Sequence, residues 1–401
     1  MDSVKINNLG ISFESCCLAG NKRWFFLNEC NALCNMDIDG DIINFSGSVP
    51  WENGFTKYLF ADIRHFNGTL ILAPRGASSI ALYNIKENKF SQIKLEKIKA
   101  KSKNAYVNWL KFICSVIVDD SIYMIPRTYP AIVELNLATR QVDYHNQWLH
   151  EADERLFENE AFFWSDYAVN GKTIILAAAN GDYLMFFDTV RKSHQIVECK
   201  NNENGFSGIE RLEDNLLLTG RKDGAIKLWD SNSNTIKNFG QLPQGFFVHK
   251  IIGFSKLVRI GSWIMAIPLW ANMLLKIDPG RETIVCLKDY DKERNGNEEI
   301  AVCCTWIEKG QLYCHNNLLK QIDIFDEKGY CGCVDLKIAE DFCQCMEKDM
   351  RSINQPLPEN PVFSLTDYQK YVTQADETQI QEENRKSYGA GIYSYLCQHP
   401  V

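Results

Sequence analysis

The chain has 401 residues with a formal net charge of −8, and 45% apolar and 23% charged residues make its composition that of an ordinary globular protein. An acidic surface repels nucleic acid and anionic membranes, and the most basic stretch, residues 94–104, is interpreted as a solvated loop, so we expect no nucleic-acid partner. No apolar run approaches the roughly 20 residues that a membrane-spanning helix requires, so we expect no membrane insertion.

The first ten residues lack the basic segment and apolar run of a signal peptide, which favours a cytoplasmic protein. The chain has 15 cysteines, an odd number, and we expect reduced thiols that pack as small core residues. Two pairs, Cys331/Cys333 and Cys343/Cys345, are spaced more closely than the Cys-x₂-Cys pairs of structural zinc sites. We therefore expect neither a metal nor another cofactor.

One pattern recurs seven times along the chain. It consists of an apolar strand, a short polar turn, a second apolar strand, and an aromatic or aliphatic residue followed by Asp or Asn. These closing residues recur about every 48 positions and are Asp37, Asn84, Asn136, Asp188, Asp230, Asp278 and Asp326. Their side chains can accept hydrogen bonds from backbone amides two residues further on, which predicts a tight turn after each second apolar strand.

A further strand is expected on each side of every repeat. Those before it are predicted at residues 12–19, 58–66, 112–120, 162–169, 208–215, 255–262 and 301–308. Those after it are predicted at residues 41–47, 89–95, 141–148, 193–199, 235–240, 283–290 and 330–338. A β-sandwich gives no reason for one motif to recur seven times. The pattern therefore predicts an all-β fold, a β-propeller of four-stranded antiparallel blades, with seven blades favoured over six or eight.

The period, the four-stranded unit and the aromatic–Asp ending resemble those of kelch-type propellers, and the fifth unit resembles a WD repeat. The residues of that unit that stand in the order typical of the WD family are Gly220, Asp223, Gly224, Ile226, Leu228, Trp229 and Asp230. The resemblance covers about four-fifths of the chain and is at superfamily level, because the kelch double glycine and the WD Gly-His are absent. It implies a propeller whose ligand site lies at the rim of the central channel.

Residues 339–401 do not repeat, so the predicted organisation is a propeller over residues 1–338 followed by a linker and a helical tail. Residues 354–361 are predicted to be an extended linker, and Ser364 with Asp367 approximates the capping box of a helix. Ile392, Tyr393 and Leu396 fall on one helical face. We interpret the tail as packed on the propeller; the alternative is a helix that binds a partner.

Equivalent positions in the seven units can be compared directly. The residues nine positions before each closing Asp or Asn are Asn28, Arg75, Arg127, Ala179, Arg221, Leu269 and Asn317. The three arginines should each follow the second strand of a blade. Guanidinium groups bind carboxylate, sulfate or phosphate bidentately, so their convergence would form an anion site. The alternative is that each arginine pairs with a nearby acid, such as Glu134 or Asp223, and stabilises the blades.

Aromatic side chains are expected near the same rim, where flat faces suit stacking on a sugar or a peptide side chain. The predicted ligand-binding set consists of Arg75, Arg127, Arg221, Asn28, Asn317, Trp270, Tyr129 and Trp51. Trp148 and Trp164 flank an acidic segment, residues 149–163, which is interpreted as a lid over the channel. The alternative for both tryptophans is packing in the core between blades.

The sequence lacks the common catalytic signatures, including G-x-S-x-G, H-E-x-x-H, a Walker loop and G-x-G-x-x-G. His249 and His315 are the histidines expected nearest the rim, and a structural role is the preferred interpretation. No catalytic residue is assigned. We therefore predict a non-catalytic module that binds a protein or peptide partner, or an anionic small ligand or glycan. The alternative is a lyase, hydrolase or epimerase acting on an acidic carbohydrate, with the arginines holding its carboxylate.

Overall fold

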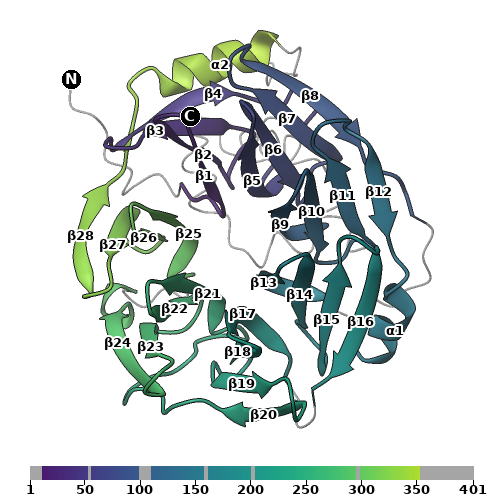
Figure 1. The fold of residues 1–401 in the computed structure, drawn as a ribbon. Helices are drawn as coiled ribbons and strands as arrows, with labels where there is room; N and C mark the ends of the chain where they lie inside the picture. The colour runs from purple at the N-terminus through teal and green to yellow at the C-terminus, as the bar shows by residue number, and fades with distance from the viewer. Residues whose placement is uncertain are drawn as a thin grey trace, which may run out of the picture. The chain divides into compact units, whose positions relative to one another are not determined.

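The computed structural model describes residues 11–52, 56–98, 110–157, 161–199, 204–294 and 299–352. Seven four-stranded sheets follow one another along the chain, each built from strands that are consecutive in sequence (Figure 1). We call them blades 1 to 7 in chain order. The predicted all-β fold of seven four-stranded antiparallel units is confirmed. No helix among these residues is long and apolar enough to cross a membrane.

The chain divides into two compact units. Unit 1 comprises residues 1–95, 320–322 and 334–401, and unit 2 comprises residues 96–319 and 323–333. Unit 1 contains the first two blades. Blade 1 consists of β1 (Cys16–Ala19), β2 (Lys22–Phe26), β3 (Leu33–Asp37) and β4 (Ile42–Gly47). Blade 2 consists of β5 (Phe60–Phe66), β6 (Thr69–Pro74), β7 (Ser79–Asn84) and β8 (Lys89–Lys94).

The next blades belong to unit 2. Blade 3 consists of β9 (Phe112–Val118), β10 (Ser121–Pro126), β11 (Ile132–Asn136) and β12 (Val142–His145). Blade 4 consists of β13 (Phe163–Asn170), β14 (Thr173–Ala178), β15 (Tyr183–Asp188) and β16 (Ser193–Glu198). Blade 5 consists of β17 (Phe206–Leu212), β18 (Asn215–Gly220), β19 (Ile226–Asp230) and β20 (Thr235–Asn238).

Blade 6 consists of β21 (Phe254–Ile260), β22 (Trp263–Pro268), β23 (Met273–Asp278) and β24 (Thr283–Asp289). Blade 7 consists of β25 (Val302–Glu308), β26 (Gln311–Asn316), β27 (Gln321–Phe325) and β28 (Tyr330–Asp335). A 3₁₀ helix, η2 (Asp291–Glu293), follows β24. The last strand predicted from the sequence, residues 330–338, is in fact two strands. Its end forms β29 (Lys337–Ile338), which pairs in parallel with β4 of blade 1.

The closing Asp or Asn makes the predicted turn in six of the seven units. In blade 2, Asn84 Oδ1 accepts hydrogen bonds from the backbone amides of Lys86 and Glu87 at 3.0 Å each. The same pair of bonds, to the amides two and three residues on, is made by Asn136, Asp188, Asp230, Asp278 and Asp326. These bonds satisfy amides that the next strand does not reach, which explains why the two residue types recur.

A second repeated residue opens the first strand of blades 2 to 7 and lies three residues before that strand in blade 1. It is buried in all seven cases, as Phe13, Phe60, Phe112, Phe163, Phe206, Phe254 and Val302. In blades 2 to 7 the pairing with the second strand becomes irregular directly after this residue. Such bulges redirect the side chain that follows. In these blades the side chain of the residue after the buried one therefore need not point to the opposite face of the sheet, as it would in a regular strand.

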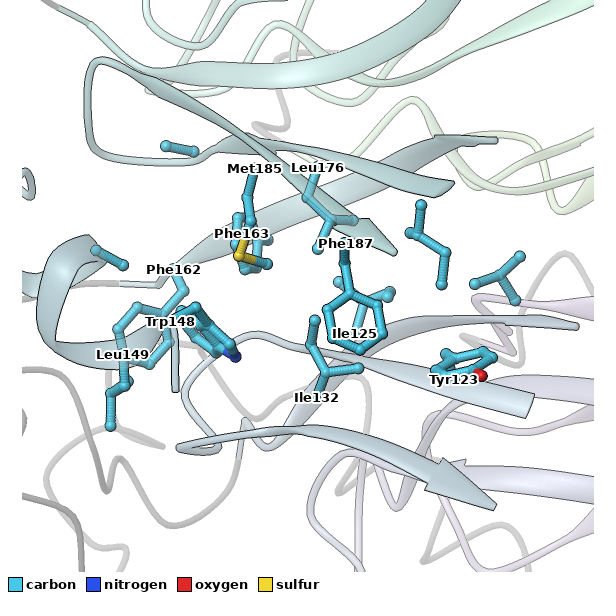
Figure 2. Close-up of a cluster of buried hydrophobic side chains, with 14 of the residues drawn as sticks. Tyr123, Ile125, Ile132, Trp148, Leu149, Phe162, Phe163, Leu176, Met185 and Phe187 are labelled. Carbon is cyan, nitrogen blue, oxygen red and sulfur yellow. The ribbon is translucent and has the colours of Figure 1, made fainter. Parts of the chain in front are cut away.

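The core of unit 2 includes a cluster contributed by blades 3 and 4 (Figure 2). Trp148 is 1% exposed, contacts the rings of Phe162 and Phe163, and donates its indole N–H to the His145 carbonyl at 2.9 Å. The segment predicted as a lid begins instead with helix α1 (Leu149–Glu154), whose Leu149 and Ala152 belong to the same cluster. Trp148 is therefore a core residue, as the alternative interpretation had it.

Helix α2 (Phe342–Ser352) confirms the predicted short C-terminal helical tail, but it precedes the predicted linker rather than following it. It packs against β4 in unit 1, where the Phe342 and Phe45 ring centroids lie 5.8 Å apart and Asp349 accepts the backbone N–H of Ser48 at 2.8 Å. The predicted linker and the helices after Ser364 lie outside the described residues. The proposed division at residues 338 and 339 therefore stays a prediction.

Candidate functional site

The residue that follows the second strand occupies the same backbone position in all seven blades. Each donates its N–H to the carbonyl of the residue just before the buried opening residue, at N···O distances of 2.8 to 3.2 Å. The donor–acceptor pairs are Asn28–Ser12, Arg75–Leu59, Arg127–Lys111, Ala179–Phe162, Arg221–Gly205, Leu269–Gly253 and Asn317–Ala301. The alignment that placed Arg75, Arg127 and Arg221 at equivalent positions is therefore correct for the backbone.

Two of the three arginines meet at one aromatic side chain in unit 2. The guanidinium carbon of Arg127 lies 4.0 Å from the ring centroid of Trp164, and that of Arg221 lies 5.5 Å from the same centroid. Trp164 directly follows Phe163, where the pairing of β13 with β14 is interrupted. Blades 3, 4 and 5 thus each contribute one residue. We call these three side chains the arginine–indole cluster.

Arg221 is held by the backbone of blade 4. Its side chain is buried, and Nη1 donates to the carbonyl of Ala179 at 3.2 Å. Ala179 is the residue at which blade 4 lacks the repeated arginine. Gly205 allows this close approach, because its φ of +67° is one that only glycine adopts readily and a Cβ there would lie 2.1 Å from the Ala179 oxygen.

Arg75, in unit 1, has different partners. Its guanidinium group forms an ion pair with Glu14, and its Cζ lies 4.5 Å from the ring centroid of Tyr58. Glu14 follows Phe13 directly, so it stands in blade 1 where Trp164 stands in blade 4. An acid therefore neutralises this arginine, but it is neither of the two acids suggested from the sequence.

Those two acids bond to other cations. Glu134 is buried and accepts hydrogen bonds from Lys192 at 2.6 Å to each oxygen, from His145 at 2.8 Å and from Tyr123 at 2.9 Å. Burial favours the neutral acid, but the bonds from Lys192 and His145 outweigh it and lower the pKa of Glu134 to about 2. Asp223 lies 3.6 Å from Lys227.

Two further members of the predicted set have structural contacts. Asn28 is buried, and its Nδ2 donates to Ser12 Oγ at 2.9 Å. Tyr129 is only 8% exposed; its hydroxyl donates to the Glu96 carbonyl at 2.6 Å and its ring lies 5.0 Å from that of Phe112. These two side chains therefore stabilise the fold around them.

The other predicted residues are half-buried. The rings of Trp51 and Phe90 lie 6.5 Å apart in an edge-on contact in unit 1. Trp270, in unit 2, has the Lys250 ammonium nitrogen 5.7 Å from its ring centroid, which is another cation–aromatic contact. Asn317 keeps the repeated backbone bond at the end of β26. The aromatic contacts of Trp51 and Trp270 do not involve the arginine–indole cluster.

Trp164 was not among the predicted ligand-binding residues. It could have been found from the repeated buried residue near the start of each first strand, because aligning the seven units on that residue brings the position directly after it into register. The residues at that position are Glu14, Ala61, Ile113, Trp164, Ser207, Ser255 and Cys303. Two of these seven contact a repeated arginine.

Histidine and cysteine side chains are the remaining candidates for catalysis or metal binding. His249 lies 3.2 Å from Asp291, whereas His315 is fully buried rather than at a rim. Within the described parts of the chain, no group of three or more His, Cys, Asp or Glu residues is arranged to hold a metal ion. Cys331 and Cys333 are exposed free thiols on β28.

No protein-family model matches this chain, and no curated protein matches it in sequence. Solved structures do match it in fold. A catalytically inactive virginiamycin B lyase from Staphylococcus aureus, crystallised with quinupristin, is 10% identical with a TM-score of 0.58, over 79% of this chain and 96% of that one. A chain of a mitotic checkpoint complex is 8% identical with a TM-score of 0.51, over 84% and 90%.

A third structure is the extracellular domain of a putative one-component system from B. thetaiotaomicron. It is 10% identical with a TM-score of 0.52, and the match covers 79% of this chain but only 39% of that one. Identities this low carry no function across, since unrelated functions share one fold. Together with the seven four-stranded sheets, these likenesses show that the chain has the fold of a seven-bladed β-propeller.

Proposed function

We propose that this propeller is a non-catalytic binding module whose arginine–indole cluster binds a carboxylate of an acidic segment in a partner protein. The observation that carries the proposal is the contact of two guanidinium groups, from blades 3 and 5, with one indole from blade 4. These cations are gathered in a chain whose net charge is −8. A local cationic site of this kind attracts anions and orients their approach.

The two arginines are close enough to act on one ligand. Their guanidinium carbons lie 4.0 and 5.5 Å from one centroid, so they are at most about 10 Å apart, near the Debye length at physiological salt. Stacking on an aromatic ring involves the face of a guanidinium group, whereas carboxylates are bound through its in-plane N–H donors. Trp164 can therefore orient the half-buried Arg127 towards an anion, while the buried Arg221 adds to the local positive charge.

A peptide carboxylate fits this cluster better than a sugar ring. A sugar stacks on the open face of an aromatic side chain, and the Trp164 ring already has a guanidinium group at 4.0 Å. Tyr129, the other aromatic residue predicted at this end of blade 3, is buried and bonded to the backbone. Acidic peptide side chains need only the guanidinium edges. We also propose a cytoplasmic location for this interaction, which the abundance of cysteine favours.

The alternative function, an enzyme acting on an acidic carbohydrate, requires a general base positioned to abstract a proton from the substrate. Glu14 lies against a repeated arginine, but its carboxylate forms an ion pair with Arg75. That ion pair gives Glu14 a role in structure rather than in proton transfer. The geometry therefore favours the binding module.

The proposal is tested by titrating a fluorescently labelled decaglutamate peptide into the protein and following fluorescence anisotropy. The double variant Arg127→Gln/Arg221→Gln should raise the Kd at least about tenfold, the effect of losing charge-assisted bonds worth 1.5 kcal/mol or more. Arg281→Gln is the matched control, since Arg281 is 82% exposed and lies in unit 2. It should change the Kd by less than about twofold.

Equal affinity of the folded double variant and the wild type would overturn the proposal, as would the absence of any binding to the wild type. A second titration uses glucuronate, followed by thermal unfolding, because a ligand that binds the folded state raises the Tm. Stabilisation by glucuronate without binding of decaglutamate would reject the peptide in favour of an acidic glycan.

A further inference from the structure

Blade 7 contains a thiol–imidazole pair that the binding proposal does not use. Cys303 Sγ lies 2.8 Å from His315 Nδ1. Cys303 is half-buried and follows the opening residue Val302, the position that Trp164 occupies in blade 4. His315 is on β26 and is fully buried. We infer that Cys303 is a nucleophilic thiol, activated by His315, that reacts covalently with electrophilic carbon compounds such as haloacetamides.

The local geometry favours this reactivity. Pairing between β25 and β26 is irregular between Val302 and Cys304, so Cys303 is the bulged residue. A bulge turns its side chain out of the regular alternation of the strand. The thiol is thereby directed at the imidazole of the neighbouring strand while it keeps partial exposure to solvent. Nucleophile and base lie within hydrogen-bond reach, as an activated nucleophile requires.

The equivalent positions in the preceding blades show what is special about blade 7. In blade 5 the corresponding pair is Ser207 with Thr219, whose hydroxyl oxygens are 3.0 Å apart. In blade 6, Ser255 Oγ lies 3.4 Å from the Ile267 carbonyl oxygen. These contacts satisfy buried polar groups but contain no base. The same architectural position in blade 7 carries a thiol and an imidazole, which can exchange a proton.

A cation also lies on the neighbouring blade. Lys256, on β21 of blade 6, reaches β25, where its ammonium group donates to the Thr305 carbonyl at 3.4 Å. Burial raises the pKa of the Cys314 thiol, on the residue before His315, well above its usual value; Asp323 raises it further, whereas Lys256 and Lys288 lower it. The activation of Cys303 therefore depends on its contact with His315.

Two of the exposed thiols, those of Cys286 and Cys331, are poorer nucleophiles by the same reasoning. Burial and the nearby Asp289 raise the pKa of Cys286. Desolvation and Asp326 raise the pKa of Cys331. Both are more exposed than Cys303 but remain protonated at neutral pH. If exposure controls alkylation, Cys286 and Cys331 should react faster than Cys303. If activation by His315 controls it, Cys303 should react faster, so the two cases can be distinguished within one molecule.

The reaction with iodoacetamide balances without any further reagent. Cys303 Sγ attacks the methylene carbon, the S–C bond forms as the C–I bond breaks, and iodide departs. The thiol proton passes to His315 Nδ1 and then to water. The product is a thioether on Cys303. No redox step is involved, because the sulfur donates an electron pair and the iodide leaves with one.

The test is a time course of alkylation of the folded full-length protein by iodoacetamide at pH 7, resolved by peptide mass spectrometry. Cys303 should react at least about threefold faster than Cys286 or Cys331. A lower thiol pKa should increase the thiolate fraction of Cys303 roughly tenfold. The same change lowers the intrinsic nucleophilicity of the thiolate, so the expected increase in reaction rate is only about threefold. Its rate should level off at a lower pH than the rates of the two exposed thiols.

His315→Gln should abolish this advantage, and Thr219→Val, the matched change in blade 5, should leave it intact. Fully buried Cys34 and Cys314 report on unfolding, because they are alkylated only if the variant opens. If His315→Gln unfolds, the pH profile of the wild type decides. The inference is overturned if Cys303 reacts no faster than the exposed thiols, or if folded His315→Gln reacts like the wild type. Neither result depends on binding of decaglutamate.

Discussion

Unit 2 contains two clusters of cationic side chains, and both include residues of blades 3 and 4. The two clusters differ in the group that contacts the cations. In one, the Lys192 ammonium group lies 2.6 Å from both oxygens of buried Glu134. In the other, Arg127 and Arg221 share the Trp164 indole as a contact. In the first cluster the lysine meets a full countercharge inside the protein, and in the second the two arginines contact the quadrupole of an aromatic ring.

This difference separates a structural role from a binding role. The Glu134 carboxylate is surrounded by Lys192, His145 and Tyr123, which occupy its acceptor sites. Such a network connects β11, β12 and the turn after β15 and stabilises the folded state. An indole neutralises no charge, so stacking on it leaves the positive charge of a guanidinium group in place. Substitutions in the two clusters test this separation, and the largest effect is expected at Lys192.

Replacing Lys192 with Met should lower the free energy of unfolding by about 2 kcal/mol, because a buried carboxylate loses its cationic partner. The figure is below that for a fully buried pair because the lysine side chain is 38% exposed. Urea denaturation measures it. Lys172→Met is the matched control, since Lys172 also pairs with a carboxylate, that of Asp119, but both side chains are more than half exposed. Equal losses in the two variants would contradict the structural role of the Glu134 cluster.

The pH dependence of stability should carry the signature of Glu134. Its pKa is about 2 in the folded protein, below the roughly 4.3 of a free glutamate, so its contribution is complete above pH 5 and is lost as the pH falls towards 2. Unfolding free energies of the wild type should therefore fall more steeply between pH 5 and pH 3 than those of Lys192→Met. Parallel curves for the two proteins would contradict the assignment.

Much of the fold could be predicted from the sequence because its determinants are local and recur seven times. The Asp or Asn turns and the apolar strands depend on residues a few positions apart, as at Asn84 and Asp230. Strand β29 could not be predicted, because it pairs with β4, almost 300 residues away in sequence. Helix α2 occurs once, so no repeat signals it, and its contact with β4 is equally non-local.

The candidate site was predicted in part for the same reason. Counting back from each turn placed three arginines at one backbone position, and the repeated N–H bond to a carbonyl bears this out. Their contacts depend on the residue after the opening Phe, which is Glu14 in one case and Trp164 in the other. Irregular pairing there redirects the side chain, and a pattern of apolar residues does not encode that direction.

Replacing Trp164 with Leu should raise the Kd for decaglutamate about tenfold, since each cation–aromatic contact contributes roughly 0.5–1 kcal/mol to orienting a guanidinium group. Fluorescence anisotropy measures the affinity, and urea denaturation checks that the fold is kept. Trp270→Leu is the matched control, because it removes the cation–aromatic contact with Lys250 outside the cluster. An unchanged Kd for Trp164→Leu would show that the arginines do not need the indole, which would weaken the contrast between the two clusters.

The smallest effect concerns the third arginine. Glu14→Gln removes the countercharge of Arg75 and should cost about 1 kcal/mol of stability, between the values for exposed and buried ion pairs, as both side chains are largely but not fully buried. Because Arg75 is not part of the arginine–indole cluster, the Kd for decaglutamate should change by less than about twofold. A markedly tighter complex in the variant would mean that Arg75 binds the peptide once Glu14 is removed. In that case Arg75 would differ from Arg127 and Arg221 only in having an acidic partner within the protein. Glu14 would then compete with the ligand for Arg75.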